Sequence, residues 1–286
     1  MKVSDQHRPV VFITGASGGF GLLISLAFAE SGYIVLASMR DLSKKETLLK
    51  KAHEQGIETN IECIGLDVTK QNDVDSTIPD VIERFGSIDV LINNAGYAAG
   101  GFTEELPLEE WRQQFETNVF GLIAVTKAVL PHMRNKQRGT IINLSSISGR
   151  MALPGLAPYS ASKHAVEGFS EALRLEMLPY GVHVVLVEPG SYQTDIWEKG
   201  MDNINVAPES PYNEKTETLM KIVNHIAKTA DAPEEVARLI VKVTQAEKPD
   251  LRYPVGKNVK TMTRLKNLLP WRWIERVILK KVSPRK

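Results

Sequence analysis

The sequence predicts an α/β fold in which a doubly wound sheet of seven parallel strands carries helices on both faces. Short apolar segments at 9–14, 33–38, 60–66, 88–93, 138–144 and 181–187 alternate with longer helix-like segments, and a seventh strand is expected at 251–255. Such alternation is typical of parallel strands that are buried on both faces. Because no internal repeat or low-complexity tract interrupts it, we expect a single domain over residues 1–256 with a C-terminal extension over 257–286.

A glycine-rich turn joins the first strand to the first helix. The apolar run 10–13 leads into Thr14 to Gly21, and helix-forming residues follow from Leu22 to Ala29. Glycines at positions 15, 19 and 21 let the backbone turn tightly and approach a pyrophosphate, whose charge a helix N-terminus favours. A plain strand-to-helix turn is the alternative. Although the glycine spacing departs from the commonest fingerprint, the strand-turn-helix context favours a dinucleotide site.

Turn-forming residues also end two later strands. Asn93-Asn94-Ala95-Gly96 follows the fourth strand, and Pro189-Gly190 ends the sixth. Asparagine and glycine favour turns wherever they occur. Open α/β sheets, however, bind their ligands at the carboxyl ends of the strands. We therefore expect these segments both to turn and to contact a ligand.

Tyr159 and Lys163 lie four residues apart on a helix predicted at 157–180, and so share one of its faces. A tyrosine, with a pKa of about 10, is a poor acid or base near neutrality unless a positive charge stabilises its phenolate. Lys163 can supply that charge. A lone pair of this kind is common on ordinary helix surfaces, but beside a dinucleotide turn it predicts a proton-transfer site.

These motifs together resemble the short-chain dehydrogenase/reductase family over about residues 8–256. The resemblance also includes Asp67 in Leu66-Asp67-Val68, Asn118, and Ser146, which stands thirteen residues before Tyr159, as in the family. It implies a Rossmann-type fold and hydride transfer between a nicotinamide and an alcohol or carbonyl substrate. The chain length and the Met39-Arg40-Asp41 segment are similar to the hydroxysteroid and retinol dehydrogenase branch.

The resemblance implies four catalytic residues. Ser146 and Tyr159 hydrogen-bond the carbonyl oxygen, and Tyr159 acts as the general acid or, in the oxidative direction, the general base. Lys163 lowers the Tyr159 pKa and binds the nicotinamide ribose. Asn118 positions a water that relays protons to Lys163. Because asparagine is a poor residue inside a helix, its place in the helix predicted at 108–135 favours this role over an ordinary exposed amide.

Cofactor choice depends on the end of the second strand, where an acidic residue favours NAD(H) and a basic one favours NADP(H). Arg40 stands there and favours NADP(H), with Ser38 adding a hydroxyl. Gly18, where many NADP users have a basic residue, and a possible Arg40 to Asp41 pair leave NAD(H) open. The cofactor contacts that the resemblance implies are Thr14, Gly15, Ser17, Gly19, Phe20, Gly21, Ser38, Arg40, Asp67, Val68, Asn93, Ala95, Gly96, Tyr159, Lys163, Pro189, Gly190 and Thr194.

Composition agrees with a cytoplasmic enzyme that holds no metal. The chain is 43% hydrophobic and 24% charged, and Cys63 is its one cysteine, which excludes an intrachain disulfide or a clustered-cysteine site. The histidines lack metal-ligand spacing. Residues 1–7 are polar and too short for a signal peptide, and no apolar run reaches the length of a transmembrane helix.

The substrate is expected to be a small carbonyl or alcohol compound. A segment at about 191–225 carries Trp197, Met201, Leu219 and Met220, and as an apolar lid it would suit a steroid, retinoid or lipid. Packing of these side chains on the core is the alternative, since fold identifies substrate poorly. A 3-oxoacyl-thioester reductase and a non-catalytic dinucleotide-binding redox sensor or scaffold are the other functions considered. The sensor is disfavoured because such relatives would be expected to lose Ser146, Tyr159 or Lys163.

The C-terminal extension is strongly basic. From Leu251 to Lys286 there are eleven lysines and arginines against one acid, Glu275. A helix beginning near Pro270 places Trp271 and Ile274 on one face, which suits an anionic membrane surface. Packing of that face against the core or a neighbouring subunit is favoured, because one short helix binds membranes weakly. No nucleic-acid motif is present. The resemblance implies a homodimer or homotetramer through helices 108–135 and 157–180.

Overall fold

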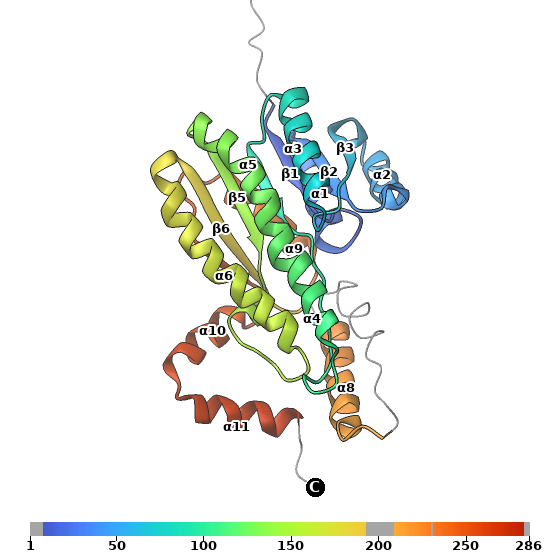
Figure 1. Cartoon of the computed structure of the whole chain (residues 1–286), viewed down its shortest axis with the longest axis vertical. Helices are drawn as coiled ribbons and strands as arrows, with labels where there is room; N and C mark the ends of the chain where they lie inside the picture. Colours follow the sequence, from blue (N-terminus) through green and yellow to red (C-terminus); the bar gives the residue numbers. More distant parts are fainter. Residues whose placement is uncertain (1–7, 193–208, 230, 283–286) are drawn as a thin grey trace, which may run out of the picture.

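The computed structural model describes residues 8–192, 209–229 and 231–282, and it confirms the predicted sheet. Seven parallel strands lie in the order β3-β2-β1-β4-β5-β6-β7, with helices on both faces (Figure 1). Every expected strand is present. They are β1 (Val10–Ile13), β2 (Ile34–Met39), β3 (Ile61–Gly65), β4 (Val90–Asn93), β5 (Gly139–Leu144), β6 (Val182–Pro189) and β7 (Arg252–Val255).

The strands are apolar along their length because both faces of the sheet are covered. In β1, Val11 and Ile13 belong to one core cluster, and Val10 and Phe12 belong to the cluster on the opposite face. This follows from the alternation of side chains along a strand. The first face is covered by α1 (Gly19–Glu30), α2 (Lys45–Glu54) and α9 (Glu234–Thr244), and the second by α3 (Gln71–Phe85), α5 (Leu122–Lys136) and α6 (Ala157–Met177).

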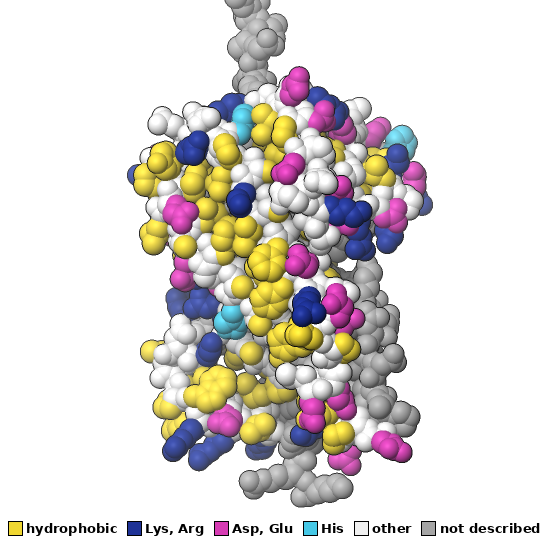
Figure 2. Space-filling view, in the orientation of Figure 1, with side chains coloured by type: hydrophobic (Ala, Val, Ile, Leu, Met, Phe, Trp, Pro, Cys, Tyr) yellow, Lys and Arg dark blue, Asp and Glu magenta, His cyan; other side chains and the backbone are white. Residues whose placement is uncertain are grey.

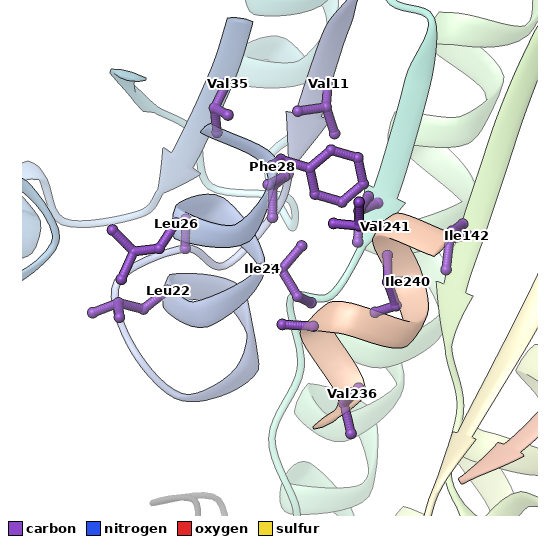
Figure 3. Packing of buried hydrophobic residues seen from close by; sticks show 14 of the residues in the cluster. Val11, Leu22, Ile24, Leu26, Phe28, Val35, Ile142, Val236, Ile240 and Val241 are labelled. Atoms are coloured by element: carbon purple, nitrogen blue, oxygen red, sulfur yellow. The ribbon is translucent and has the colours of Figure 1, made fainter. Parts of the chain in front are cut away.

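The packing of α1 on α9 shows how the first face is closed. Phe28 and Ile24 of α1 point toward Ile240 and Val241 of α9, over the strand residue Val11 (Figure 3). All of these side chains except Val241 are completely buried, and Val241 is 9% exposed. Burying a side chain of this size stabilises the fold by about 1.5–3 kcal/mol. The core thus holds α1, and with it the glycine turn, rigidly against the sheet.

The helix predicted over 108–135 is interrupted at its middle. A π-helical segment, Glu116–Gly121, joins α4 (Leu108–Phe115) to α5. A π segment admits an extra residue into the helix, and such segments are frequent at functional sites. Asn118 lies in this segment and is 1% exposed, so it is not an ordinary surface amide.

The C-terminal extension continues directly from the sheet. After β7 come α10 (Val259–Leu268) and α11 (Trp271–Val282), and α11 lies against α8 (Asn213–Thr229) (Figure 1). Val259 is 3% exposed, and a Cβ at Gly190 would stand 2.6 Å from its Cγ2. The start of α10 therefore packs against the residue that follows β6. None of the described helices is both long and apolar enough to cross a bilayer.

Candidate active site

The glycine turn forms a cradle at the N-terminus of α1. Gly15 has φ +71°, a left-handed conformation that favours glycine, and a Cβ at Gly21 would lie 2.2 Å from the Gly15 carbonyl oxygen. Gly18 is the N-cap of α1 and makes no side-chain cap hydrogen bond. The first amides of α1 are thus left for an anion. Ser17 and Phe20 lie half-buried in the same turn.

Asn94 holds this cradle in place, and sequence reasoning did not select it. Its Nδ2 donates to the carbonyl oxygens of Thr14 at 2.9 Å and of Gly15 at 3.0 Å. Thr14 Oγ1 accepts from the backbone amides of Asn94 and Ala95, at 3.0 Å each. These bonds join the end of β1 to the end of β4, so the predicted ligand-binding edge is brought together here.

The side chain of Asn93 lies in the interior, which leaves only its backbone for the expected contact with a ribose. Its Nδ2 donates to Thr126 Oγ1 at 2.9 Å and to Asn143 Oδ1 at 2.8 Å, and the residue is 3% exposed. Asn143 stands opposite Asn93 in the β4–β5 register, so the two amides form a buried cross-strand pair. The Asn93 side chain therefore faces the interior instead of a ribose.

The end of β2 presents the residues that bear on cofactor choice. Ser38 and Met39 are buried, whereas Arg40 is exposed. Ser38 Oγ is buried and has no hydrogen-bond partner among the described residues. The Asp41 carboxylate accepts from Ser43 N at 3.0 Å and from Ser43 Oγ at 2.7 Å. These hydrogen bonds are the largest cause of the lowered pKa of Asp41, and the charges of Lys44 and Arg40 add to it, so Asp41 interacts with Arg40 without a direct ion pair among the described contacts.

The remaining predicted contacts surround the same crevice, with one exception. Asp67 Oδ1 accepts from Thr69 N at 3.1 Å and from Thr69 Oγ1 at 2.8 Å, and Val68 beside it is buried. Gly96 lies against Asn118, because a Cβ there would stand 3.0 Å from Oδ1. Pro189 ends β6 and Gly190 follows it. Thr194 lies outside the described residues, as do residues 193–208 of the expected lid.

Ser146, Tyr159 and Lys163 come together at the carboxyl end of β5 and the start of α6. Each is nearly inaccessible, with exposed fractions of 6%, 4% and 6%. Ser146 hydrogen-bonds Tyr159, and Ser146 Oγ accepts from Ser148 N at 3.1 Å. Lys163 Nζ donates to Leu144 O at 2.6 Å and lies 5.8 Å from the centre of the Tyr159 ring. A hydroxyl, a phenol and an ammonium thus meet in one buried pocket of polar groups.

Burial dominates the protonation of this group. It raises the pKa of Tyr159 above its usual value of 10, and the hydrogen bond with Ser146 lowers that pKa by less. The expected net lowering of the Tyr159 pKa is therefore not found, because the cost of taking a phenolate out of water is the largest contribution to the shift. Burial also lowers the pKa of Lys163 from 10.5 to about 8, opposed by the charge of Glu167. Near neutrality Tyr159 carries its proton and can donate it.

Asn118 connects the pocket to the strand-end loop. Its Oδ1 accepts from Tyr97 N at 3.1 Å, and its Nδ2 donates to Tyr97 O at 3.0 Å and to Ser162 Oγ at 3.1 Å. Ser162 Oγ in turn donates to Tyr159 O at 2.7 Å. The amide thus fixes the loop at Tyr97 to the helix that carries Tyr159 and Lys163.

A buried cluster of two arginines and two glutamates lies behind the pocket, and sequence reasoning missed it. Arg252 Nε stands 3.1 Å from both Glu167 Oε2 and Glu188 Oε1, and Arg150 Nη1 stands 3.5 Å from Glu188 Oε1. Burial and the charge of Glu167 raise the pKa of Glu188 to about 7, although both arginines oppose the shift. The cluster ties α6, β6 and β7 to the segment that follows Ser146.

The described part of the lid closes on two loops near the pocket. The rings of Tyr212 and Phe102 stack with their centres 4.4 Å apart, and Tyr212 Oη hydrogen-bonds Glu104 Oε2 at 2.5 Å. Leu219 of α8 reaches the loop after Ser146, where a Cβ on Gly155 would stand 2.8 Å from its Cδ1. Apolar and aromatic side chains therefore join the described part of the lid to the loop at Phe102 and to the loop that follows Ser146.

The residues present fit a nicotinamide dinucleotide. The glycine cradle has no room for a Cβ at Gly21, the first turn of α1 has no side-chain cap, and the unpartnered Ser38 hydroxyl lies beside the exposed Arg40. The cradle, Arg40 and Lys163 lie along the crevice outside the carboxyl ends of the strands, where the strand order reverses at β1.

Comparison with known proteins agrees with this geometry. The family model for short chain dehydrogenases matches residues 9–205. An uncharacterized oxidoreductase of Bacillus subtilis, YusZ, is 42% identical over 97% of this chain and 99% of its own length. A 3-ketodihydrosphingosine reductase of Bacteroides thetaiotaomicron is 37% identical over 91% of this chain and 93% of its own. Human retinol dehydrogenase 8 is 33% identical, covering 90% and 85%.

Solved structures show the same architecture. A short-chain dehydrogenase from Streptomyces avermitilis superposes with a TM-score of 0.78 at 32% identity, covering 97% of each chain. A variant of actinorhodin polyketide ketoreductase with NADPH gives a TM-score of 0.74 at 32% identity, covering 88% of this chain and 97% of its own.

Proposed function

The chain belongs to the short-chain dehydrogenase/reductase family, in its retinol dehydrogenase-like branch, and we propose that it is an NADPH-dependent reductase of a long-chain, lipid-like ketone. Members act on CH-OH or C=O groups with NAD(P). The observation that supports the proposal is the buried meeting of Ser146, Tyr159 and Lys163 at the carboxyl end of the sheet.

The catalytic residues supply a proton and stabilise charge. When bound, the nicotinamide supplies the hydride. Ser146 and Tyr159 donate hydrogen bonds to the carbonyl oxygen as negative charge develops on it, and Tyr159 passes its proton to that oxygen. The raised Tyr159 pKa keeps this proton in place until the oxygen becomes basic. The Lys163 ammonium then offsets the phenolate that is left, and Asn118 holds α6 in register with the Tyr97 loop.

NADP(H) is proposed over NAD(H) because of the end of β2. Arg40 is exposed there and carries the positive charge that a 2′-phosphate requires. The Asp41 carboxylate beside it is fixed by hydrogen bonds from Ser43 and keeps its negative charge, which opposes this choice. The relative with polyketide ketoreductase activity is described with NADPH, which supports the same choice.

The substrate is proposed to be an amphiphilic ketone with a long alkyl chain. Phe102, Tyr212 and Leu219 lie where the described part of the lid meets two loops. We infer that they border the substrate opening, and their surfaces suit an alkyl chain. The 3-ketodihydrosphingosine reductase is named for a long-chain ketone, and retinol dehydrogenase 8 is named for an apolar alcohol. A 3-oxoacyl thioester is the second candidate, favoured by the likeness to a polyketide ketoreductase.

The test is NADPH and NADH oxidation with 3-ketodihydrosphingosine, retinal, ketosteroids and 3-oxoacyl thioesters. We expect turnover of a long-chain ketone with NADPH preferred. Tyr159→Phe should lower kcat by about 100-fold or more while NADPH affinity stays the same, and Tyr180→Phe, at an exposed tyrosine outside the site, serves as the control. Full turnover by Tyr159→Phe contradicts the assignment. Tight NADPH binding without turnover of any compound favours the redox sensor.

A homodimer or homotetramer is also proposed. Leu108 of α4, Phe120 of the π segment and Leu175 of α6 are 64%, 54% and 74% exposed. They lie on the two helical segments through which an assembly is expected. Light scattering after size exclusion measures the mass of the assembly, which Leu175→Glu should lower. A natural chain that is a monomer contradicts the proposal.

A further inference from the structure

The C-terminal helices expose an unusual share of large hydrophobic side chains. Among the described residues, half of the exposed large hydrophobics belong to α10, α11 and the link between them. They are Met262 (41%), Leu265 (47%), Leu268 (79%), Leu269 (38%), Trp271 (56%), Trp273 (60%), Val277 (60%) and Leu279 (50%). We call them the tail surface. Single exposed apolar residues need no explanation, but so many within two consecutive helices favour an interaction site. On α11, Trp273 and Val277 share one face, and Trp271 and Leu279 lie on other sides of the helix.

The tail surface is left over after the extension has packed. Val259 anchors α10 on Gly190, and Ile274 of α11 is 9% exposed, so each helix already has an inward contact. Trp273 and Val277, one helical turn apart, remain exposed. Of the face expected to pack, Trp271, Ile274 and Ile278, Ile274 is buried whereas Trp271 is 56% exposed, and Trp273 and Val277 are uncovered as well.

Positive charge surrounds the tail surface. Lys257, Lys260 and Arg264 are exposed on or just before α10, and Arg272, Arg276 and Lys280 are exposed on α11, against the single acid Glu275. Figure 2 shows lysine and arginine side chains beside hydrophobic ones at the lower edge of the molecule, where Figure 1 places α11. Tryptophan beside lysine and arginine is the composition of a helix that lies in a lipid interface.

The tail surface lies at the same end of the molecule as the substrate opening. α10 starts at the carboxyl end of β7, and Lys266 Nζ donates to the carbonyl oxygen of Arg150 in the segment that follows Ser146. α11 packs against α8, whose Leu219 borders the opening. A surface bound by α10 and α11 would therefore be close to the route into the site.

We propose that α10 and α11 dock the protein on an anionic lipid bilayer, and that the substrate opening there receives its ketone from the membrane. The second part rests on the proposed function. A second copy of the chain is a poorer occupant, because two such faces would bring their lysines and arginines together. An anionic bilayer satisfies both features, since its headgroups attract the basic residues and its interface accepts the tryptophans.

The test is binding of the full chain to phosphatidylcholine vesicles with and without phosphatidylglycerol, followed by co-sedimentation and tryptophan emission. We expect binding to the anionic vesicles at low salt, a blue-shifted emission, and release at high salt. The double variant Trp273→Glu, Val277→Glu should lower the affinity by about tenfold or more. Tyr180→Glu, at a 44% exposed aromatic at the opposite end of the sheet, should bind as the natural chain does.

Three results would overturn the proposal. The first is a natural chain that does not bind anionic vesicles at low salt. The second is a double variant that binds them as well as the natural chain does. The third is a double variant that is a monomer where the natural chain is an oligomer, which assigns the face to self-association. NADPH oxidation with a water-soluble ketone checks that the double variant is folded and active. Vesicle binding does not depend on turnover, so bound protein that reduces no lipid ketone refutes the proposed function and leaves the docking intact.

Discussion

Replacing Lys163 by methionine should make the protein more stable at neutral pH while it loses activity. Burial holds the Lys163 pKa at about 8 instead of 10.5. That difference corresponds to a penalty of about 3 kcal/mol for keeping the ammonium charged in the folded protein at pH 7. Methionine fills a similar volume without this charge. It also leaves Leu144 O, now bonded at 2.6 Å, without its donor, which costs about 1–3 kcal/mol.

The net gain for Lys163→Met at pH 7 is therefore expected to be about 1 kcal/mol, within a range from zero to about 2. Its sign depends on pH. Because the folded pKa of Lys163 is depressed to about 8, the penalty in the natural chain is fully present below pH 8 and disappears as pH rises toward 10.5. Above that pH only the lost hydrogen bond remains, and the variant should be the less stable protein.

Urea unfolding of both proteins between pH 6.5 and 10.5, followed by circular dichroism, measures this difference. The pH range covers the two values of 8 and 10.5 that bound the titration of Lys163. A free-energy difference that stays constant with pH refutes the burial argument, as does a variant that is clearly less stable at pH 7. In the natural enzyme, kcat/KM for reduction should fall about tenfold per pH unit above 8, as Lys163 loses its charge.

Three further predictions concern the cradle, the cofactor and the ion cluster. Gly21→Ala should weaken NADPH binding by about tenfold or more, because its Cβ would meet Gly15 O at 2.2 Å, whereas Gly18→Ala, which meets nothing within 4 Å, should bind normally in the same fluorescence titration. Arg40→Ala should raise the KM for NADPH by about tenfold with little change for NADH. Glu188→Gln should raise the Tm relative to the natural chain more at pH 8 than at pH 5. The folded pKa of Glu188 is raised to about 7, so this carboxyl makes the natural chain less stable as pH rises through that value. Equal Tm shifts at both pH values contradict this.

The sequence predicted the fold because its signals are local. Apolar strands such as β1 and the glycines of the α1 turn report their own environment, whatever else surrounds them. The residues missed at the site depend on partners distant in the chain. Asn94 acts through carbonyl groups at the end of β1, and Glu167 and Glu188 meet only after α6 has packed on β6. No pattern within one segment reveals such pairs.

Asn93 and Asn94 show that the sequence alone also does not reveal which of two neighbouring residues acts at the site. Asn93 and Asn94 are chemically identical, yet one faces Asn143 in the sheet and the other holds the cradle. Alternation along β4 decides between them, and its phase becomes known only when the strand pairing is known. The direction of the Tyr159 pKa shift was missed for a related reason. The charge of Lys163 can be inferred from its spacing in the sequence, whereas the depth at which Tyr159 is buried cannot.

The π segment that carries Asn118 gives this chain a route to losing activity without losing its fold. An α-helix that loses one residue turns everything beyond it by about 100°, which would swing the buried side of α5 away from the sheet. Within Glu116–Gly121 the helix already holds an extra residue, so a one-residue deletion there returns α4 and α5 to a single continuous helix. A duplicated gene could thereby discard the amide that links Tyr97 to α6 and still encode a well-packed protein.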